Sequence, residues 1–491
     1  MSARPRVVVV GAGITGLAAA HYLRRKLPDA ELVVLESRAR AGGNIQTETQ
    51  GGFVIDAGPD SFLRTKPAAR RLCAELGLEP ELVRPRADAR HVFVVHQGAL
   101  VPMPGGMVLS VPTRLGPMIG TPLLSLPGKL RMLGDIVVPV GFGRGDPERD
   151  ESIADFVRRR FGAEAAERIA SPLLGGIYAG DVSELSLRAT FPQLAELEQG
   201  FGSVILGLCA PSAKLPAGVP RTLGERTSRI KSVLSWLRRD EGAPAESPFL
   251  SLRGGMGQLI ERLTNELGPA LRVGAPVRRI SVEGRRFSIA LDGETLDADA
   301  VLLAAPAHVA ASIVPSCELS RELGAIRYTS TATVFFAFDR ESVRHPLQGS
   351  GFVVPKGEGD LLAATWISSK WDDRAPEGSV LLRAFIGGTH GAELLDRSDD
   401  EIYAIVTFEL ERLMGPLGAP LLRRIHRYER ANPLPEVGHP ARLQRLRALS
   451  AELPGLELAG AAYDGVGIPD CVRQAEAAAE RIAQRFRAER A

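Results

Sequence analysis

Short apolar runs and amphipathic stretches alternate at both ends of the chain. Val7–Val10 is an uninterrupted β-branched run, which is typical of a buried parallel strand. A glycine turn follows, Ile14–Lys26 is predicted as a helix, and Glu31–Glu36 as the next strand. Near the C-terminus we expect a strand, a glycine-rich turn and a helix at 456–459, 460–470 and 471–485. Because strand, helix and strand in this order begin a parallel α/β sheet, we expect the two ends to close one discontinuous domain.

The middle of the chain has a different pattern. Alternation at Thr331–Phe338 and Val380–Ile386 predicts strands of a sheet with one solvated face. From residue 84 to 145, prolines and glycines recur among methionines and leucines, so we expect short helices in an inserted domain. Residues 212–248 are polar and proline-bounded, which predicts a mobile connection and a helix. Further helices are expected at 66–78, 152–161 and 163–169, and further strands at 277–282, 287–291 and 301–304.

Composition narrows the class of protein. A chain of 491 residues can form two or three domains, and its net charge of +2 predicts no nucleic-acid partner. The four cysteines show no metal-ligand spacing, so we expect free thiols, a reducing compartment and no metal site. The apolar stretch from Val7 to Leu23 superficially resembles a secretory signal, but three glycines interrupt it and no cleavage site is obvious. We therefore expect a cytoplasmic protein without a spanning helix.

The turn after the first strand carries the first chemical signal. Residues 11–16 read G-x-G-x-x-G, with Gly11 permitting the tight turn, Gly13 letting the backbone approach a pyrophosphate, and Gly16 letting helix pack on strand. The helix N-terminus presents free amides to an anion. Glu36 ends the next strand, where its carboxylate can accept hydrogen bonds from a ribose diol. The sequence therefore predicts dinucleotide binding.

A second glycine pair favours FAD over NAD. Arg40, Gly42 and Gly43 follow Glu36 in a Glu-x-x-x-Arg-x-Gly-Gly pattern, which resembles the extended fingerprint of the glutathione-reductase-like flavoproteins, particularly the amine-oxidase superfamily. The acidic Glu36 argues against NADP, whose extra phosphate favours an arginine. The alternative for Gly42-Gly43 is a plain surface turn.

Three longer segments sharpen this resemblance. Phe53–Ser61, ending in Gly-Pro-Asp-Ser, resembles the Gly-Pro-Asn-Ser-Phe segment of the protoporphyrinogen oxidase family. Gly175–Leu187 contains Ile-Tyr-Ala-Gly-Asp, which is close to that family's Gly-Val-Tyr-Ala-Gly-Asp signature. Leu458–Cys471 resembles its C-terminal flavin motif, so the resemblance extends along the whole chain.

The resemblance implies both a reaction and an architecture. The reaction is the FAD-dependent oxidation of protoporphyrinogen IX to protoporphyrin IX late in haem synthesis, with O2 as acceptor and release of H2O2. The fold would be α/β: a discontinuous Rossmann-like FAD-binding domain, a mixed α+β substrate domain and an inserted helical membrane-associated domain. The expected division is 1–83 FAD-binding; 84–210 helical, membrane and substrate region; 211–270 FAD-binding connection and helix; 271–430 mixed sheet, with FAD-binding strands in 271–305 and the substrate domain in 306–430; and 431–491 FAD-binding.

The resemblance also assigns residues. Those expected to hold FAD are Gly11, Gly13, Ile14, Thr15, Gly16, Glu36, Ser37, Arg40, Gly42, Gly43, Gly58, Pro59, Asp60, Ser61, Val277, Ala305, Tyr428, Gly460, Val466, Gly467 and Ile468. Those expected to contact substrate are Arg90, as a propionate anchor, together with Gly175, Val353, Trp366 and Phe385. The alternatives are a solvated surface arginine, core packing for the apolar side chains, and a C-terminal helix start without a ligand.

The chain departs from the family at one expected cofactor contact. The sequence also leaves the binding partners undecided. Where the family commonly has a tryptophan before a Pro-Gln-Tyr segment, this chain has Tyr428 and lacks the Gln-Tyr element, which leaves contacts to the flavin face open. Residues 84–145, with Arg114, Lys129 and Arg131, suit peripheral binding to the inner face of the cell membrane, the alternative being a buried helical subdomain. A ferrochelatase partner and a homodimer stay open.

Three other functions are alternatives to this one. Coproporphyrinogen III oxidation on the same fold is the first alternative, because the two substrates differ in the number of carboxylates. A flavin amine oxidase or carotenoid desaturase is the second, but these lack the segment Tyr178–Asp181 in this form. A scaffold that hands on porphyrin without chemistry is the third, and the intact glycine turn speaks against it.

Overall fold

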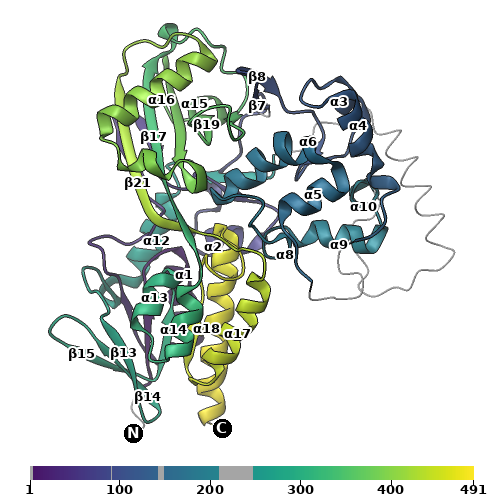
Figure 1. The fold of residues 1–491 in the computed structure, drawn as a ribbon. Coiled ribbons are helices and arrows are strands. Elements are labelled where there is room, and N and C mark those ends of the chain that lie inside the picture. The colour runs from purple at the N-terminus through teal and green to yellow at the C-terminus, as the bar shows by residue number, and fades with distance from the viewer. Residues whose placement is uncertain (1–3, 90, 142–148, 210–246, 491) are drawn as a thin grey trace.

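The computed structural model describes residues 4–89, 91–141, 149–209 and 247–490. Figure 1 shows an α/β part that carries both chain termini at one end, and at the other end a large sheet beside a group of helices. The expected helix within 212–248 lies almost entirely outside the described residues. Arg90 also lies outside them.

A five-stranded parallel sheet forms the centre of the α/β part. Its order is β12 (Leu271–Arg272), β2 (Glu31–Leu35), β1 (Arg6–Val10), β16 (Ala300–Leu303) and β22 (Leu456–Leu458). These strands come from the start, the middle and the end of the chain, and all four pairings are parallel. The prediction that the two chain ends close one sheet is confirmed.

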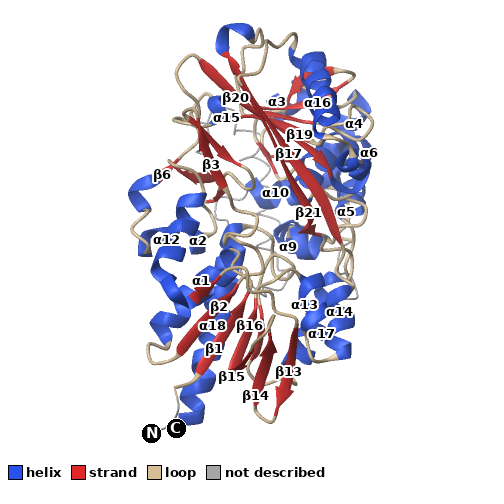
Figure 2. Ribbon diagram, turned by 90° about the vertical axis from the view of Figure 1, so that its left-hand side faces the viewer, coloured by secondary structure: helices blue, strands red, loops and turns tan. Residues whose placement is uncertain are grey.

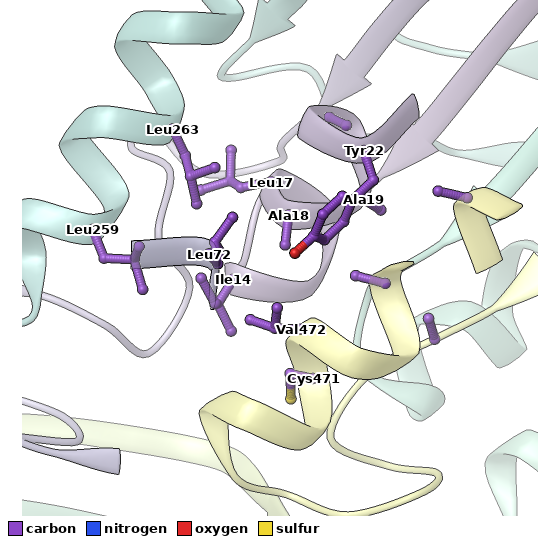
Figure 3. Packing of buried hydrophobic residues seen from close by; sticks show 14 of the residues in the cluster. Ile14, Leu17, Ala18, Ala19, Tyr22, Leu72, Leu259, Leu263, Cys471 and Val472 are labelled. Atoms are coloured by element: carbon purple, nitrogen blue, oxygen red, sulfur yellow. The ribbon is translucent and has the colours of Figure 1, made fainter. Parts of the chain in front are cut away.

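Four helices pack together beside this sheet. Figure 3 shows Leu17 beside Leu263 and Ile14 beside Val472 in their shared core. Ala18–Ala20 are fully buried, so small side chains let the first helix approach its neighbours closely. The helices are α1 (Ile14–Lys26), α2 (Pro67–Glu75), α12 (Gly257–Leu267) and α18 (Ile468–Arg490). A second layer contains the antiparallel strands β13 (Arg279–Glu283), β14 (Arg286–Ala290) and β15 (Thr295–Ala298), with helices α13 (Ala307–Ile313), α14 (Cys317–Gly324) and α17 (His439–Ala451).

The seven-stranded sheet is the largest element and corrects one prediction. Its order is β21 (Leu422–Pro433), β17 (Tyr328–Asp339), β20 (Ser379–Gly387), β19 (Ala363–Trp366), β18 (Gly351–Val353), β7 (Val92–His96) and β8 (Ala99–Pro102). Residues 92–102 were expected in short helices, but they add two edge strands to this sheet. The long strands β17 and β21 are visible at one edge in Figure 2.

Both faces of this sheet are covered, so the expectation of one solvated face is wrong. Val334 and Phe336 of β17 pack into one apolar cluster with α16 (Asp399–Met414). The intervening Phe335 and Ala337 pack into a second cluster that includes Phe53 and Ile55. Alternation here separates two buried faces, because another part of the chain covers each of them. The covering strands are β3 (Thr47–Gln50) and β4 (Phe53–Asp56), with β5 (Phe62–Leu63), β6 (Leu82–Val83) and β11 (Phe249–Leu252) nearby.

The helical part begins after a short hairpin of β9 (Met107–Val108) and β10 (Val111–Pro112). Met118 and Met132 are buried in its core. Among the described residues, no helix combines the length and the apolar character needed to cross a bilayer. The helices are α3 (Leu115–Gly120), α4 (Leu126–Leu133), α5 (Ile153–Phe161), α6 (Ala163–Ala165), a π-helix (Ala166–Gly175), α7 (Gly176–Tyr178), α8 (Leu187–Thr190), α9 (Pro192–Phe201) and α10 (Val204–Cys209).

Candidate functional site

The glycine turn between β1 and α1 has the form of a phosphate cradle. Gly11 has φ +99°, and a Cβ there would lie 3.0 Å from the backbone of Ala304 and Ala305. A Cβ at Gly16 would lie 1.9 Å from the Gly11 carbonyl oxygen. A Cβ at Gly13, in contrast, would meet no atom of the described residues within 4 Å. Two glycines therefore close the turn, and the third leaves its backbone open to a ligand at the N-terminus of α1.

Glu36 is fixed beside this turn. Its side chain is buried at the end of β2 and accepts hydrogen bonds from the backbone amides of Ala12 and Arg38, both at 2.9 Å. The Ser37 hydroxyl also donates to it, at 3.3 Å. Each carboxylate oxygen can accept more than one hydrogen bond, so Glu36 can hold a ribose hydroxyl from this fixed position.

The second glycine pair packs on the first turn. The Gly42 amide donates to the Ala12 carbonyl at 2.8 Å, and a Cβ at Gly43 would lie 3.2 Å from the Gly13 Cα. The Arg40 guanidinium donates to the carbonyls of Ala41 and Gly43, at 3.2 and 3.0 Å. The pair is therefore part of the glycine cradle and not a plain surface turn, and Arg40 holds its shape.

Two further predicted FAD contacts lie around the same edge of the sheet. The Ala275 amide donates to the carbonyl of Glu36 at 2.8 Å, which brings the chain before Val277 beside Glu36. Ala305 follows β16, and its amide lies against Gly11. A contact of Val277 with the adenine stays a prediction.

The C-terminal glycine turn lies next to the first turn of α1. A Cβ on Gly460 would lie 3.9 Å from the Thr15 hydroxyl of α1. The turn continues through Val466 and Gly467 into α18, which begins at Ile468. Ile14 of α1 and Ile468 of α18 belong to the same buried cluster, so the N-termini of the two helices lie near each other, and their free amides favour negative charge there. Asp470 in the first turn of α18 pairs with Lys66 at 2.6 Å, a contact that sequence analysis missed.

Residues 58–61 are held by a buried ionic network. The Asp60 carboxylate accepts from the Lys370 ammonium and the Trp371 indole, both at 3.0 Å, and lies 3.3 Å from the Arg383 guanidinium. Burial alone would raise the pKa of Asp60, but Lys370 and Arg383 outweigh it and hold the pKa well below its usual range. Asp60 is thus an ionised anchor whose oxygens already have protein donors, including the Ser61 hydroxyl at 2.9 Å.

Asp56, four residues earlier, forms a second buried pair. It lies 3.2 Å from the Arg374 guanidinium and accepts from the Thr47 hydroxyl at 2.5 Å. Its backbone donor is Met256, at 2.9 Å. Burial raises the pKa of Asp56 despite these partners.

One face of the seven-stranded sheet is turned toward residues 57–58. The Thr333 hydroxyl donates to the Ala57 carbonyl at 2.9 Å, and Arg383 donates to the Gly58 carbonyl at 2.9 Å. Phe385 lies opposite Thr333 across the sheet, and Val353 lies in the same row through Ala363. Strand register thus brings two predicted substrate contacts, Val353 and Phe385, onto the face that also meets the predicted flavin-flanking loop.

Tyr428 belongs to this face as well. It lies opposite Thr331 on β21, and a Cβ at Gly58 would lie 3.5 Å from its hydroxyl. That hydroxyl is buried without a hydrogen-bond partner among the described residues, and burial raises the pKa of Tyr428 to about 12. A buried, unpartnered hydroxyl beside Gly58 fits a site that receives a polar ligand.

Trp366 and Gly175 stand apart from this row. Trp366 is fully buried in the cluster on the opposite face, with its ring centroid 5.6 Å from that of Phe93. The geometry favours core packing for this residue. Gly175 ends the π-helix, and a Cβ there would lie 2.9 Å from the Gly180 carbonyl, so the Tyr-Ala-Gly turn itself requires a glycine. Pro59 follows Gly58 in the cofactor loop, and its contact with FAD stays a prediction.

The sequence did not predict the side chains that hold Asp60 in place. Lys370, Trp371 and Arg383 converge on Asp60. A signal was present for Arg383, because a charged residue inside the apolar run 380–386 must find a buried partner.

The whole architecture matches a known family. The family model for flavin-containing amine oxidoreductases matches residues 14–483. The chain belongs to this family. As a member of the flavin-containing amine oxidoreductases it takes FAD as its cofactor. The open glycine turn at Gly13 and the buried carboxylate of Glu36 fit the phosphate and ribose groups of such a dinucleotide, and their contact with FAD stays a prediction.

Relatives of this amine oxidoreductase cover nearly its whole length. The coproporphyrinogen III oxidase of Bacillus subtilis (strain 168) is 36% identical, over 97% of this chain and 97% of its own. The chloroplastic protoporphyrinogen oxidase of Oryza sativa subsp. japonica is 32% identical, over 97% of this chain and 87% of its own. A solved structure from Exiguobacterium sp. 255-15, described as a candidate protoporphyrinogen oxidase, is 34% identical with a TM-score of 0.84, covering 99% of this chain and 100% of its own.

Proposed function

We propose that this flavoenzyme oxidises a porphyrinogen to the corresponding porphyrin, with O2 as the final acceptor and H2O2 as the second product. The observation that carries the proposal is the 36% identity, over 97% of both chains, to a relative named for porphyrinogen oxidation. Val353, Phe385 and Tyr428 share the sheet face that meets residues 57–58, and this supports the proposal, because a large flat substrate needs an apolar wall along the cofactor.

When bound, FAD would supply the redox chemistry: in each two-electron step the substrate would lose two hydrogens, one as a hydride to the flavin and the other as a proton to solvent. The chain's own residues bind and orient. The N-termini of α1 and α18 would stabilise negative charge on the cofactor. Loop 58–61 is held in place through Asp60, so the flavin and the apolar sheet face would keep a fixed position relative to each other. We propose Gly175 as the close backbone contact to the macrocycle and Arg90 as a propionate anchor, both from the family resemblance.

The relatives make coproporphyrinogen III the first substrate to test. Relatives named for it are 36% and 32% identical in Bacillus subtilis (strain 168) and Staphylococcus aureus (strain NCTC 8325 / PS 47). Those named protoporphyrinogen oxidase are 32% identical in Oryza sativa subsp. japonica and 30% in Bos taurus. We keep protoporphyrinogen IX as the second candidate, since the two substrates differ mainly in carboxylate count.

The test is anaerobic mixing of the FAD-loaded enzyme with each porphyrinogen in turn. We expect the flavin absorbance to bleach, and porphyrin fluorescence to appear with H2O2 when air is admitted. A higher kcat/KM for coproporphyrinogen III would support the first choice, and a higher value for protoporphyrinogen IX would reverse it. A flavin that stays oxidised with both would overturn porphyrinogen oxidation.

We also propose that the helical part binds an anionic membrane surface. Ile119, Leu126, Leu130 and Val137 are 59%, 70%, 63% and 82% exposed on α3, α4 and the turn that follows. Lys129 donates to the Ile119 carbonyl, which leaves its positive charge uncompensated by that contact. Apolar side chains beside a cation suit a peripheral membrane contact. A ferrochelatase partner and a homodimer stay predictions.

A further inference from the structure

The buried ionic network that holds residues 58–61 carries an excess of positive charge. Two carboxylates, Asp56 and Asp60, face three cations, Arg374, Lys370 and Arg383. The five side chains are at most 14% exposed, so water screens them weakly. With every group ionised, one positive charge is left over. Because burial raises the pKa of Asp56 and so favours its neutral form, the excess is not smaller than this.

The three cations have different structural duties. Arg383 donates to the carbonyls of Asp56 and Gly58, at 3.2 and 2.9 Å, and its guanidinium lies 4.5 Å from the centroid of the Phe385 ring. Arg374 donates to the Leu252 carbonyl at 2.9 Å and lies against Asp56. These two arginines hold backbone in place, so their loss would move the site.

Lys370 differs from the two arginines, because among the described residues its ammonium has no hydrogen bond to a backbone carbonyl. It ends α15 (Ile367–Lys370), its ammonium pairs with Asp60, and it lies 5.0 Å from the centroid of the Trp371 ring. Asp60 keeps Arg383, the Trp371 indole and the Ser61 hydroxyl if Lys370 is removed. The charge of Lys370 can therefore be tested separately from the position of the loop.

We propose that Lys370 raises the reduction potential of the bound FAD, by leaving one uncompensated positive charge beneath the loop that flanks the flavin ring. Taking up two electrons and one proton leaves the flavin with one more negative charge than before. A nearby buried cation stabilises that charge, and the low local dielectric lets the effect reach through one layer of backbone. The inference rests on FAD lying against residues 58–61 and holds for any reducing substrate.

The experiment measures the midpoint potential of the FAD-loaded protein by anaerobic reduction with a reference dye, without porphyrinogen. Lys370→Gln is expected to shift the potential to a more negative value, whereas Lys370→Arg keeps the charge and the wild-type potential. Lys356→Gln is the matched control, because this lysine is exposed in the turn after β18 and its charge is screened by solvent. The visible flavin spectrum reports whether each variant keeps its cofactor in place.

A second variant is expected to shift the midpoint potential in the opposite direction. Asp60→Asn removes a negative charge from the same network and is expected to shift the potential to a more positive value. Asparagine stands at this place in the family segment that residues 58–62 resemble, so the substitution suits the fold. An unchanged potential in flavin-loaded Lys370→Gln would overturn the proposal. So would loss of FAD from both variants, because the network would then act only as a support. Neither result would contradict the proposal of porphyrinogen oxidation, which is tested separately with the wild-type enzyme.

Discussion

At the scale of single residues, Gly13 and Gly16 occupy one turn for different reasons. A Cβ on Gly16 would lie 1.9 Å from a backbone oxygen, whereas one on Gly13 would meet no described atom within 4 Å. We therefore expect Gly16→Ala to lower the free energy of unfolding of the apoprotein by about 3 kcal/mol, since the backbone must shift. Urea unfolding without FAD measures this change.

Gly13→Ala is the matched variant. We expect the stability of its apoprotein to stay within about 0.5 kcal/mol of wild type, while the dissociation constant of FAD rises roughly 10- to 100-fold because the new methyl group meets the phosphates. Titration of the apoprotein with FAD measures it. Unchanged FAD affinity in Gly13→Ala would contradict the cradle.

At the scale of elements, a buried ion cluster joins the helices of the helical part. Arg160 of α5 is fully buried, 2.6 Å from Asp135 in the turn after α4 and 3.4 Å from Glu198 of α9. Arg160→Met leaves Asp135 without its counter-ion, so we expect the free energy of unfolding to fall by about 3–5 kcal/mol. Chemical denaturation followed by circular dichroism measures the loss.

Arg158→Met is the control on the same helix. Arg158 is 52% exposed and, among the described residues, its ion pair is with Asp155 one turn earlier, so its loss should cost less than about 1 kcal/mol. Equal effects of the two substitutions would show that the buried cluster does not hold the helices together.

At the scale of the whole molecule, the membrane proposal depends on the exposed apolar side chains Ile119, Leu126, Leu130 and Val137 of α3, α4 and the following turn. We expect wild-type protein to sediment with anionic phosphatidylglycerol vesicles. The double substitution Leu126→Gln with Leu130→Gln should weaken this binding about tenfold, because two exposed leucines no longer enter the interface.

Phe408→Gln serves as the control for the vesicle experiment. Phe408 is 65% exposed on α16, which packs on the seven-stranded sheet away from α4, so its loss should leave vesicle binding unchanged. Wild-type protein that stays in the supernatant would overturn the membrane proposal.

The sequence predicted the elements whose pattern is local. The helix Ile14–Lys26 was placed to the residue, and the strands at 6–10, 31–35 and 300–303 within one or two residues. Local patterns suffice there, because a buried parallel strand is apolar throughout and a glycine turn marks its end. The sequence missed strands 92–102, whose partners lie far away in the chain, and wrongly left one face of the large sheet in solvent.

By itself, then, the sequence determined the α/β core, the glycine cradle with Glu36 and the family, since each depends on short-range spacing. Only the tertiary structure decided which side chains share a face. Strand register set Val353, Phe385 and Tyr428 on the sheet face that meets residues 57–58, and it turned Trp366 into the core. It also gathered Lys370, Trp371 and Arg383 around Asp60, because buried charges must find partners wherever the fold brings them.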